Sequence, residues 1–511
     1  MKYRTGDRVL IQCGDVMENM YRILPLAETL RARGMVPVIM PYTPGAGSFF
    51  LARGFECVGL GPYQQSVTSS DINRTTLPDE FFDDAFTPIY PFAFSSSGGA
   101  NSELNKQRYM LRRAGVAVSR LVRDHSIDWI ITWNGVTGAV ANALRLFAMA
   151  RSMNAGFLER GYLSGSLFFD QVGTNGASSI ADGLTRKHDA QAIARAVSRR
   201  KAEVDQALQN FQPDPAQREK VIFVPLQVQG DSNILLYSPV VKTMRQLVLD
   251  ALEMRNALGE GWRVVVRDHP EEIEPTLNIP YDPNLTRDVV TPLEDMLDRA
   301  RIVMTVNSTV GLSAACRGAV VICRGNGIYC DEPFVIKDVD GALLDPASPV
   351  AKRIAWGPNE QDVRDYLSLL FDYHTVAYAD DFGDRNGVAL SAFGQAGAQA
   401  KQDTPLDLMT RKLQSFQSQE RTPLHVESRL SYDETLLRTY RVHEKATPKT
   451  IKEDLARIYP GLDVSISHDR SDRPKSETIL VVASNESVSE ADRDYLAVLD
   501  EYGYPHQETL R

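Results

Sequence analysis

The sequence VIFVPLQVQGDS, residues 221–232, decides the fold of this chain. Its first part, Val221 to Pro225, is a short apolar run rich in β-branched residues, which predicts a buried strand. Its second part is polar and ends in Asp231 and Ser232, and a helix is predicted to begin near Pro239. A buried strand, a polar turn and a helix in this order are typical of a parallel α/β sheet.

The same order of elements recurs on both sides of this stretch. Further strands are predicted at Arg8–Gln12, Val36–Met40, Phe55–Leu60, Asp128–Thr132, Gly156–Arg160, Trp262–Arg267, Ile302–Thr305 and Val320–Cys323. Helices are predicted at Met20–Arg33, Leu104–His125, Ala139–Met153, Asp189–Phe211, Pro239–Ala257, Pro292–Arg299, Val310–Arg317 and Asp362–His374. The pattern predicts an α/β protein of GT-B-like architecture, with two Rossmann-like lobes around a central cleft and a small C-terminal α/β appendage.

Two changes in composition suggest the domain boundaries. Prolines cluster in residues 212–217, after the long charged helix, and place the linker between the lobes near residue 213. The sequence turns polar beyond about residue 402, with one predicted strand at Thr478–Ala483 and one helix at Ser489–Tyr502. We therefore expect an N-terminal lobe over residues 1–213, a C-terminal lobe over 214–402, and an accessory or truncated following module over 403–511.

Composition narrows the classes of function. The net charge of −10 over 511 residues argues against nucleic acid as a partner, although local arginines and backbone N–H groups can still bind a phosphate. The apolar runs are too short to span a bilayer and the first 20 residues lack a secretion signal, so a cytoplasmic protein is expected. Five cysteines without a CxxC pair, and scattered histidines, favour core thiols and no metal site.

Polar side chains follow three of the predicted strands in the second lobe. Gln227, Asp231 and Ser232 follow the first strand, the sequence from Arg267 to Pro270 follows the second, and Asn307-Ser308-Thr309 follows the third. Taken singly, these are an Asp in a turn, a structural His-Pro pair and an ordinary capped helix. Because the carboxyl ends of parallel strands share one edge of the sheet, the three loops together are expected to face one crevice that binds an anion.

The order QxxxDS, [RK]xHP and NSTxGLxA resembles the capsule polysaccharide biosynthesis family, specifically the retaining β-Kdo transferases that build the capsule linker or terminate certain O-antigens in lipopolysaccharide biosynthesis. The resemblance covers roughly residues 150–330 and is strongest in the second lobe. It implies CMP-Kdo as donor, a glycan or glycolipid as acceptor, no cofactor, and a covalent intermediate on Asp231. Peripheral association with membrane polysaccharide assembly machinery at the inner membrane face is left open.

The resemblance also implies roles for individual residues. His269, Ser308 and Thr309 correspond to the positions that hold the nucleotide phosphate. Arg267 stands where the family has lysine, and the stretch beginning at Glu159 matches a family Glu-x-Gly motif only loosely. The full set of expected donor-binding residues is Gln227, Ser232, Arg160, Gly161, Arg267, Pro270, Asn307, Ser308 and Thr309.

The chemistry of the donor supports these roles. Kdo carries a carboxylate on its anomeric carbon, and an enzyme carboxylate can stabilise an oxocarbenium-like transition state there, so Asp231 is expected to attack. Arg160 and the loop from Gly161 to Ser166 are expected to bind the Kdo carboxylate, and Glu159 or His269 to act as the acceptor base. Two alternatives stay open: an inverting, sialyltransferase-like enzyme with Asp231 as base, and a non-catalytic nucleotide-sugar-binding scaffold.

Overall fold

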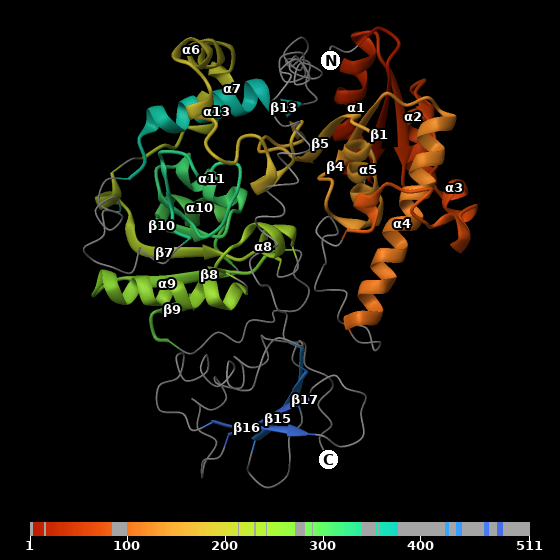
Figure 1. Ribbon diagram of the computed structural model, residues 1–511. Helices are drawn as coiled ribbons and strands as arrows, with labels where there is room; N and C mark the ends of the chain where they lie inside the picture. The colour runs from red at the N-terminus through yellow and green to blue at the C-terminus, as the bar shows by residue number, and fades with distance from the viewer. Residues whose placement is uncertain are drawn as a thin grey trace.

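The structure is a computed structural model. It describes residues 4–14, 17–83, 100–212, 214–228, 231–241, 243–270, 282–288, 290–339, 354 and 357–376, and four strands between residues 425 and 483. The described residues form two parallel or mostly parallel sheets with helices packed around them, and a third, antiparallel sheet (Figure 1). Within these ranges no helix combines the length and the apolarity that crossing a bilayer requires.

The first sheet has seven strands in the order β13-β6-β5-β4-β1-β2-β3. Its strands are β1 (Arg8–Cys13), β2 (Val36–Pro41), β3 (Glu56–Cys57), β4 (Trp129–Trp133), β5 (Asn154–Arg160), β6 (Leu167–Asp170) and β13 (Thr375–Val376). The helices of this lobe are α1 (Met17–Ala32), α2 (Pro44–Leu51), α3 (Gly61–Gln65), α4 (Ala100–Asp124) and α5 (Gly138–Ala150). Strands β1 to β5 are parallel, as predicted, whereas β6 pairs antiparallel with both β5 and the edge strand β13.

The second sheet is wholly parallel, with six strands in the order β12-β11-β10-β7-β8-β9. Its strands are β7 (Glu219–Pro225), β8 (Arg263–Arg267), β9 (Leu285–Arg287), β10 (Ala300–Thr305), β11 (Val320–Cys323) and β12 (Val335–Lys337). The helices of this lobe are α8 (Ser232–Tyr237), α9 (Met244–Leu258), α10 (Leu293–Arg299), α11 (Thr309–Ala315) and α13 (Glu360–Tyr373). The predicted pair of Rossmann-like lobes is confirmed, and Cys13, Cys316, Cys323 and Cys330 are buried as expected of core thiols.

The third sheet lies below the two lobes in the view of Figure 1. It contains β14 (His425–Ser428), β15 (Leu436–Arg441), β16 (Val464–Asp469) and β17 (Thr478–Ala483), all antiparallel. The strand predicted at Thr478–Ala483 is therefore confirmed. The helix predicted at Ser489–Tyr502 lies outside the described residues.

One predicted helix is two helices in the structure. The charged segment 189–211 forms α6 (Ala190–Arg199) and α7 (Lys201–Ala207), which meet at Arg200. The Arg200 side chain is fully buried, and its Nε donates to Asp372 Oδ1 at 3.1 Å. Because a buried guanidinium needs a charged partner, this contact with α13 fixes the chain where the two helices meet.

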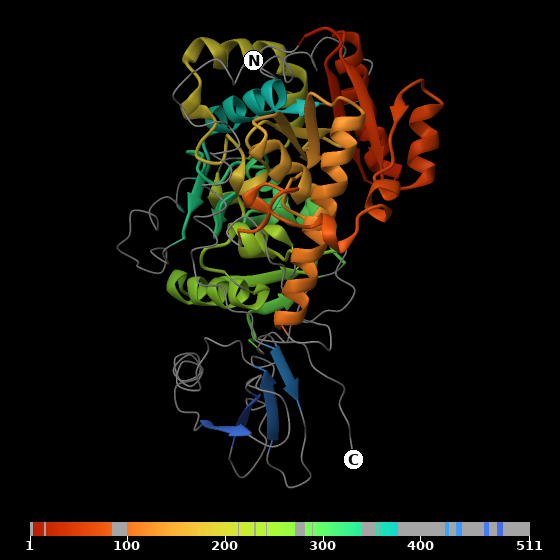
Figure 2. The ribbon, with the colours of Figure 1, turned by 45° about the vertical axis from the view of Figure 1, so that its right-hand side comes forward.

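The chain returns to the first lobe after completing the second. Helix α13 packs on α6, and the strand that follows it, β13, pairs with β6 at the edge of the first sheet (Figure 2). The Phe169 N–H donates to the carbonyl oxygen of His374 at 2.9 Å, which joins the two elements just before this pairing. The two lobes are thus tied together both at the linker and at this sheet edge.

Candidate active site

The carboxyl ends of β7 and β10 are linked by a buried pair of amide side chains. Gln227 Nε2 donates to Asn307 Oδ1 at 3.1 Å, and the backbone N–H of Asn307 donates to Gln227 Oε1 at 3.4 Å. The two residues are only 6% and 7% exposed. The structure therefore brings these two predicted residues together, where they hold two strand ends in a fixed relation.

Asp231 is the N-cap of α8 and is half-buried. Its Oδ1 accepts from the Asn233 N–H at 3.2 Å and from Ser232 Oγ at 3.1 Å, and its Oδ2 accepts from Asn233 Nδ2 at 3.0 Å. Asp231 therefore does cap a turn, which is the ordinary interpretation of an aspartate at such a position. The same contacts fix the direction of its carboxylate, which is what a nucleophile requires.

Glu159 stands at the end of β5 in the first lobe, close enough to Asp231 for the two charges to interact. Its Oε1 accepts from the Arg160 N–H at 2.9 Å. Burial raises the pKa of Glu159 to about 7, and the charge of Asp231 adds to that rise. Two predicted carboxylates from different lobes therefore interact through their charges.

Ser308 and Thr309 occupy the start of α11, as predicted. Ser308 is the N-cap, and its Oγ accepts from the Val310 N–H at 3.3 Å, while its carbonyl oxygen accepts from the buried Tyr329 hydroxyl. Thr309 is exposed as the first helical residue. These two residues give the strand-to-helix turn after β10 the polar character that the motif predicts.

The segment after β8 has partners that the sequence did not predict. The Arg267 guanidinium donates to the carbonyl oxygens of Thr291 and Asp288 and pairs with Asp288 Oδ1 at 3.8 Å. These contacts hold Arg267 at the turn after β9. His269 is half-buried and Pro270 is exposed. Strand β8 already ends at Arg267, so the chain leaves the sheet before His269 and not at the proline as predicted.

The glycine-rich loop after Arg160 is the turn of an antiparallel hairpin between β5 and β6. A Cβ on Gly161 would lie 2.0 Å from Ser166 Oγ, so this close approach requires glycine. Tyr162 carries the loop onto the second lobe, where its ring stacks on Phe371 at 6.1 Å. Arg160 itself is exposed. The loop therefore joins the lobes, in addition to any contact with a ligand.

Two polar residues of the first lobe lie near the carboxyl ends of β1 and β4 and were not predicted as site residues. Gln12 is the residue before the last in β1, and its Oε1 accepts from Thr132 Oγ1 at 2.5 Å and from the Trp133 N–H at 3.1 Å. Asn134 follows β4, and its backbone N–H donates to the carbonyl oxygen of Leu158 in β5 at 2.8 Å. The signal that could have found Asn134 is the one used in the second lobe, a polar residue directly after a buried strand.

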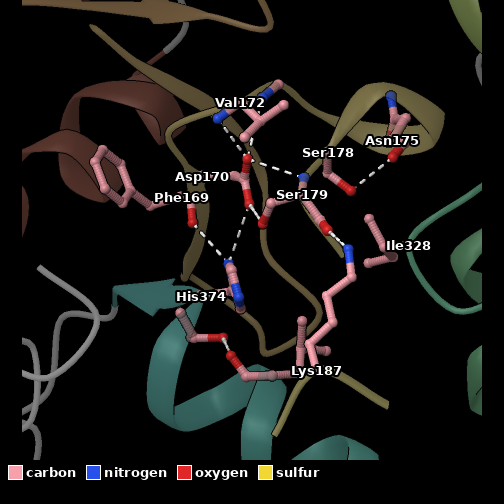
Figure 3. Close-up of polar contacts among 12 residues, drawn as sticks. Phe169, Asp170, Val172, Asn175, Ser178, Ser179, Lys187, Ile328 and His374 are labelled. Carbon is pink, nitrogen blue, oxygen red and sulfur yellow. Dashed lines mark hydrogen bonds and ion pairs between the residues drawn. The ribbon is translucent and has the colours of Figure 1, made fainter. Parts of the chain in front are cut away.

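A second cluster surrounds Asp170 at the end of β6, and we call it the Asp170–His374 clasp (Figure 3). Asp170 Oδ1 accepts from the N–H groups of Val172, Gly173 and Ser179 at 2.7, 3.0 and 3.1 Å, and Oδ2 accepts from Ser179 Oγ. His374 Nδ1 lies 3.4 Å from Asp170 Oδ2. Ser179 and His374 both contact the aspartate, whereas a nucleophilic triad needs the serine on the histidine, so the clasp is structural.

Among the described residues, no three His, Cys, Asp or Glu side chains are grouped so that they could hold a metal ion.

Comparison with known proteins identifies a family over part of the chain. Residues 184–332 match the family described as capsule polysaccharide biosynthesis protein, which confirms the resemblance inferred from the motifs. Protein FixF of Sinorhizobium fredii is 28% identical over 229 residues, which is 43% of this chain and 54% of that protein. The chain thus spans about half the length of this curated relative.

Two solved structures of Thermosulfurimonas dismutans KpsC are similar to parts of the chain. The β-Kdo 2,7 transferase is 19% identical, with 51% of this chain and 81% of that chain covered and a TM-score of 0.34. The β-Kdo 2,4 transferase is 17% identical, with 47% and 79% covered and a TM-score of 0.31.

Proposed function

We propose that this chain, whose residues 184–332 match the capsule polysaccharide biosynthesis family, is a retaining glycosyltransferase that moves Kdo from CMP-β-Kdo to a glycan or glycolipid acceptor. The observation that carries the proposal is that Glu159 and Asp231 stand in different lobes and that the charge of Asp231 contributes to the raised pKa of Glu159. Transfer with retention uses two carboxyl groups, one as nucleophile and one for proton transfer. The match to the family and the motif order support Kdo as the sugar.

Asp231 is the proposed nucleophile. One carboxylate oxygen forms a bond to the anomeric carbon of Kdo while the bond to the CMP phosphate breaks, and CMP leaves with the bonding electron pair. In the second step the acceptor oxygen attacks that carbon, the ester to Asp231 breaks and Glu159 takes the hydroxyl proton. A pKa of about 7 suits Glu159 to this role as general base.

The donor is proposed to lie between the strand ends of the two lobes. His269 and the α11 start at Ser308 and Thr309 would stabilise the charge on the leaving phosphate. Arg160, exposed beside Glu159, would bind the Kdo carboxylate. The Gln227–Asn307 pair keeps the strand ends at a fixed spacing, and Ser232 supports Asp231. The site belongs in the cytoplasm, with membrane assembly machinery as a proposed neighbour.

A metal is not part of this proposal, because CMP is already a good leaving group whose charge can be stabilised by the helix start and His269. Transfer activity should therefore persist in EDTA, measured as release of CMP at a saturating donor concentration. Activity that is lost in EDTA and restored by magnesium would contradict this account of the phosphate site.

Mass spectrometry of the intact protein after incubation with CMP-Kdo tests the mechanism. Without acceptor, the protein should gain the mass of one Kdo residue, and peptide mapping should locate it on Asp231. The Asp231→Ala variant should show no such gain, whereas Glu159→Gln should retain it because the first step needs no base. A product of inverted configuration without an adduct would favour the sialyltransferase-like alternative, and binding of CMP-Kdo without CMP release would favour the scaffold alternative.

A further inference from the structure

Helix α8, which begins directly after Asp231, contributes side chains to the hydrophobic cores of both lobes. Ile234 is buried in the core of the second lobe, together with Val224. Leu236 and Tyr237 are buried instead in the core of the first lobe. Figure 1 shows α8 on the side of the second lobe that faces the first. This short helix is therefore held from two sides, and the position of its start depends on both lobes.

The first lobe meets α8 at Gly176, in the 3₁₀ turn η5 (Asn175–Ala177). A Cβ on Gly176 would lie 2.8 Å from Tyr237 Cδ1 and 3.0 Å from the carbonyl oxygen of Asn326. Both distances are shorter than an ordinary van der Waals contact. The close approach of the two lobes at this point therefore requires glycine.

The turn that carries Gly176 has little freedom to move away from α8. The Ala177 N–H donates to the carbonyl oxygen of Thr174 at 2.9 Å. The N–H and Oγ of Ser178 both donate to the carbonyl oxygen of Asn175, at 3.1 and 2.8 Å (Figure 3). Thr174, Ala177 and Ser178 are fully buried. A larger side chain at position 176 would therefore press on α8, because the closely packed turn cannot absorb it.

The second lobe holds the other end of α8 through Asn326, which follows β11. The Asn326 N–H donates to the carbonyl oxygen of Tyr237 at 2.8 Å, and the Asn326 carbonyl oxygen accepts from Asn307 Nδ2 at 2.8 Å. Asn307 is also the partner of Gln227. A continuous set of hydrogen bonds thus joins the end of α8 to the ends of β7 and β10.

We propose that Gly176 is a positioning residue, which acts through Tyr237 and Asn326 to set where Asp231 lies relative to the strand ends. The inference rests on the proposed function, because that function gives the position of Asp231 a purpose in bond formation. Gly176 does not touch the donor and acts only through α8. Displacing a reacting group by about 1 Å can slow a reaction by about 10²-fold, so a methyl group at position 176 should slow the attack without weakening nucleotide binding.

Two variants disturb this contact from opposite sides. Gly176→Ala adds a methyl group against Tyr237 and Asn326, whereas Tyr237→Leu removes the ring and keeps an apolar side chain. The double variant should lose less than the sum of the two single losses, because the added methyl group no longer meets a ring. The matched control is Gly115→Ala on α4, which packs on α3 and α5. Its Cβ would lie 2.3 Å from Phe81 Cε1, so it crowds the core of the same lobe at another helix.

The first measurement is hydrogen exchange in full-length protein without ligand, followed by mass spectrometry. The N–H groups of Ile234 and Leu235 donate to the Asp231 carbonyl oxygen at 3.0 Å each, so they report on the start of α8. We expect them to exchange at least about tenfold faster in Gly176→Ala and Tyr237→Leu, and at the wild-type rate in Gly115→Ala. Circular dichroism establishes which variants are folded. Exchange at the wild-type rate in every folded variant of Gly176 or Tyr237 would overturn the proposal.

The second measurement separates the chemical step from nucleotide binding. In Gly176→Ala, kcat for CMP release should fall by about 10- to 100-fold, while the dissociation constant of CMP stays within about twofold of the wild-type value. Gly115→Ala should change neither quantity. Equal losses of kcat in Gly176→Ala and Gly115→Ala would show a general loss of stability and would exclude a positioning role.

Hydrogen exchange needs no substrate, so its outcome is independent of the donor chemistry. If the wild-type protein forms no Kdo adduct and releases no CMP, the proposed function fails. The exchange rates of Ile234 and Leu235 then still decide whether Gly176 holds the helix that begins at Asp231.

Discussion

Asp170 and Glu159 lie on paired strands of the first sheet, yet the surroundings of the two carboxylates are opposite in character. Asp170 accepts four hydrogen bonds from its own loop, and His374 lies beside it. Glu159 accepts from the Arg160 N–H, and burial together with the charge of Asp231 raises its pKa to about 7. The comparison teaches that a buried carboxylate surrounded by hydrogen-bond donors fixes the path of the backbone around it. A carboxylate with few donors and a like-charged neighbour is instead suited to proton transfer.

The largest effect should come from removing the partner of Glu159. Asp231→Ala should lower the rate of Kdo transfer by roughly 10³-fold or more, because it removes the proposed nucleophile. It should lower the free energy of unfolding by only about 0.5–2 kcal/mol, the usual cost of a lost helix cap. CMP release and thermal unfolding measure the two effects. Near-normal turnover with retained stereochemistry would exclude Asp231 as nucleophile.

Substituting the structural carboxylate should give the opposite pattern. Asp170→Ala leaves the N–H groups of Val172, Gly173 and Ser179 without their acceptor, so the free energy of unfolding should fall by about 3–5 kcal/mol. In protein that remains folded at low temperature, the Kdo adduct on Asp231 should still form. A variant as stable as wild type would show that the clasp contributes little to the fold.

A smaller and pH-dependent effect is expected for Glu159→Gln. The folded-state pKa of Glu159, about 7, exceeds its usual value of 4.5, so ionisation at high pH opposes folding. The variant should therefore be more stable than wild type by about 1–3 kcal/mol at pH 8, and this advantage should shrink between pH 7 and 4.5 and vanish below. Urea unfolding at several pH values measures it. An advantage that is constant with pH would contradict the raised pKa.

The smallest effect should come from removing one donor of the clasp. Ser179→Ala takes away the hydroxyl on Asp170 Oδ2 and leaves the three N–H groups on Oδ1, so a loss of about 1 kcal/mol is expected. Ser164→Ala, at an exposed position of the β5–β6 turn, serves as the control and should change stability by less than about 0.5 kcal/mol. Equal effects of the two substitutions would mean that the hydroxyl adds nothing to the clasp.

The sequence predicted those parts of the fold that depend on local patterns. Apolar runs such as Val221 to Pro225 marked the parallel strands, and the polar residues after them marked the edge where Gln227 and Asn307 meet. The edge strand β13 was not predicted, because a strand of two residues is too short to show an alternation of apolar and polar side chains. The partners of Arg267 were missed for a related reason: they come from the turn after β9, and a three-residue strand is a weak signal.

The site shows the same division between local and distant contacts. Asp231 and Glu159 could be named from motifs, but their approach across the lobes depends on how two separate sheets pack. The division of one predicted helix into α6 and α7 depends on Asp372, far along the chain from Arg200. The sequence signal for Asn134 is local, because it is a polar residue directly after a strand. Searching the first lobe for such residues, as was done in the second lobe, would have found it.

The pairing of β13 with β6 has a consequence for how this protein is made. Phe168 leaves the ribosome long before its partner Thr375, and at ordinary elongation rates the interval is roughly 10–40 s. Throughout that interval the nascent first lobe presents β6 as an unpaired edge, the kind of surface on which chains aggregate. Completion of the first sheet must therefore wait for translation of the second lobe.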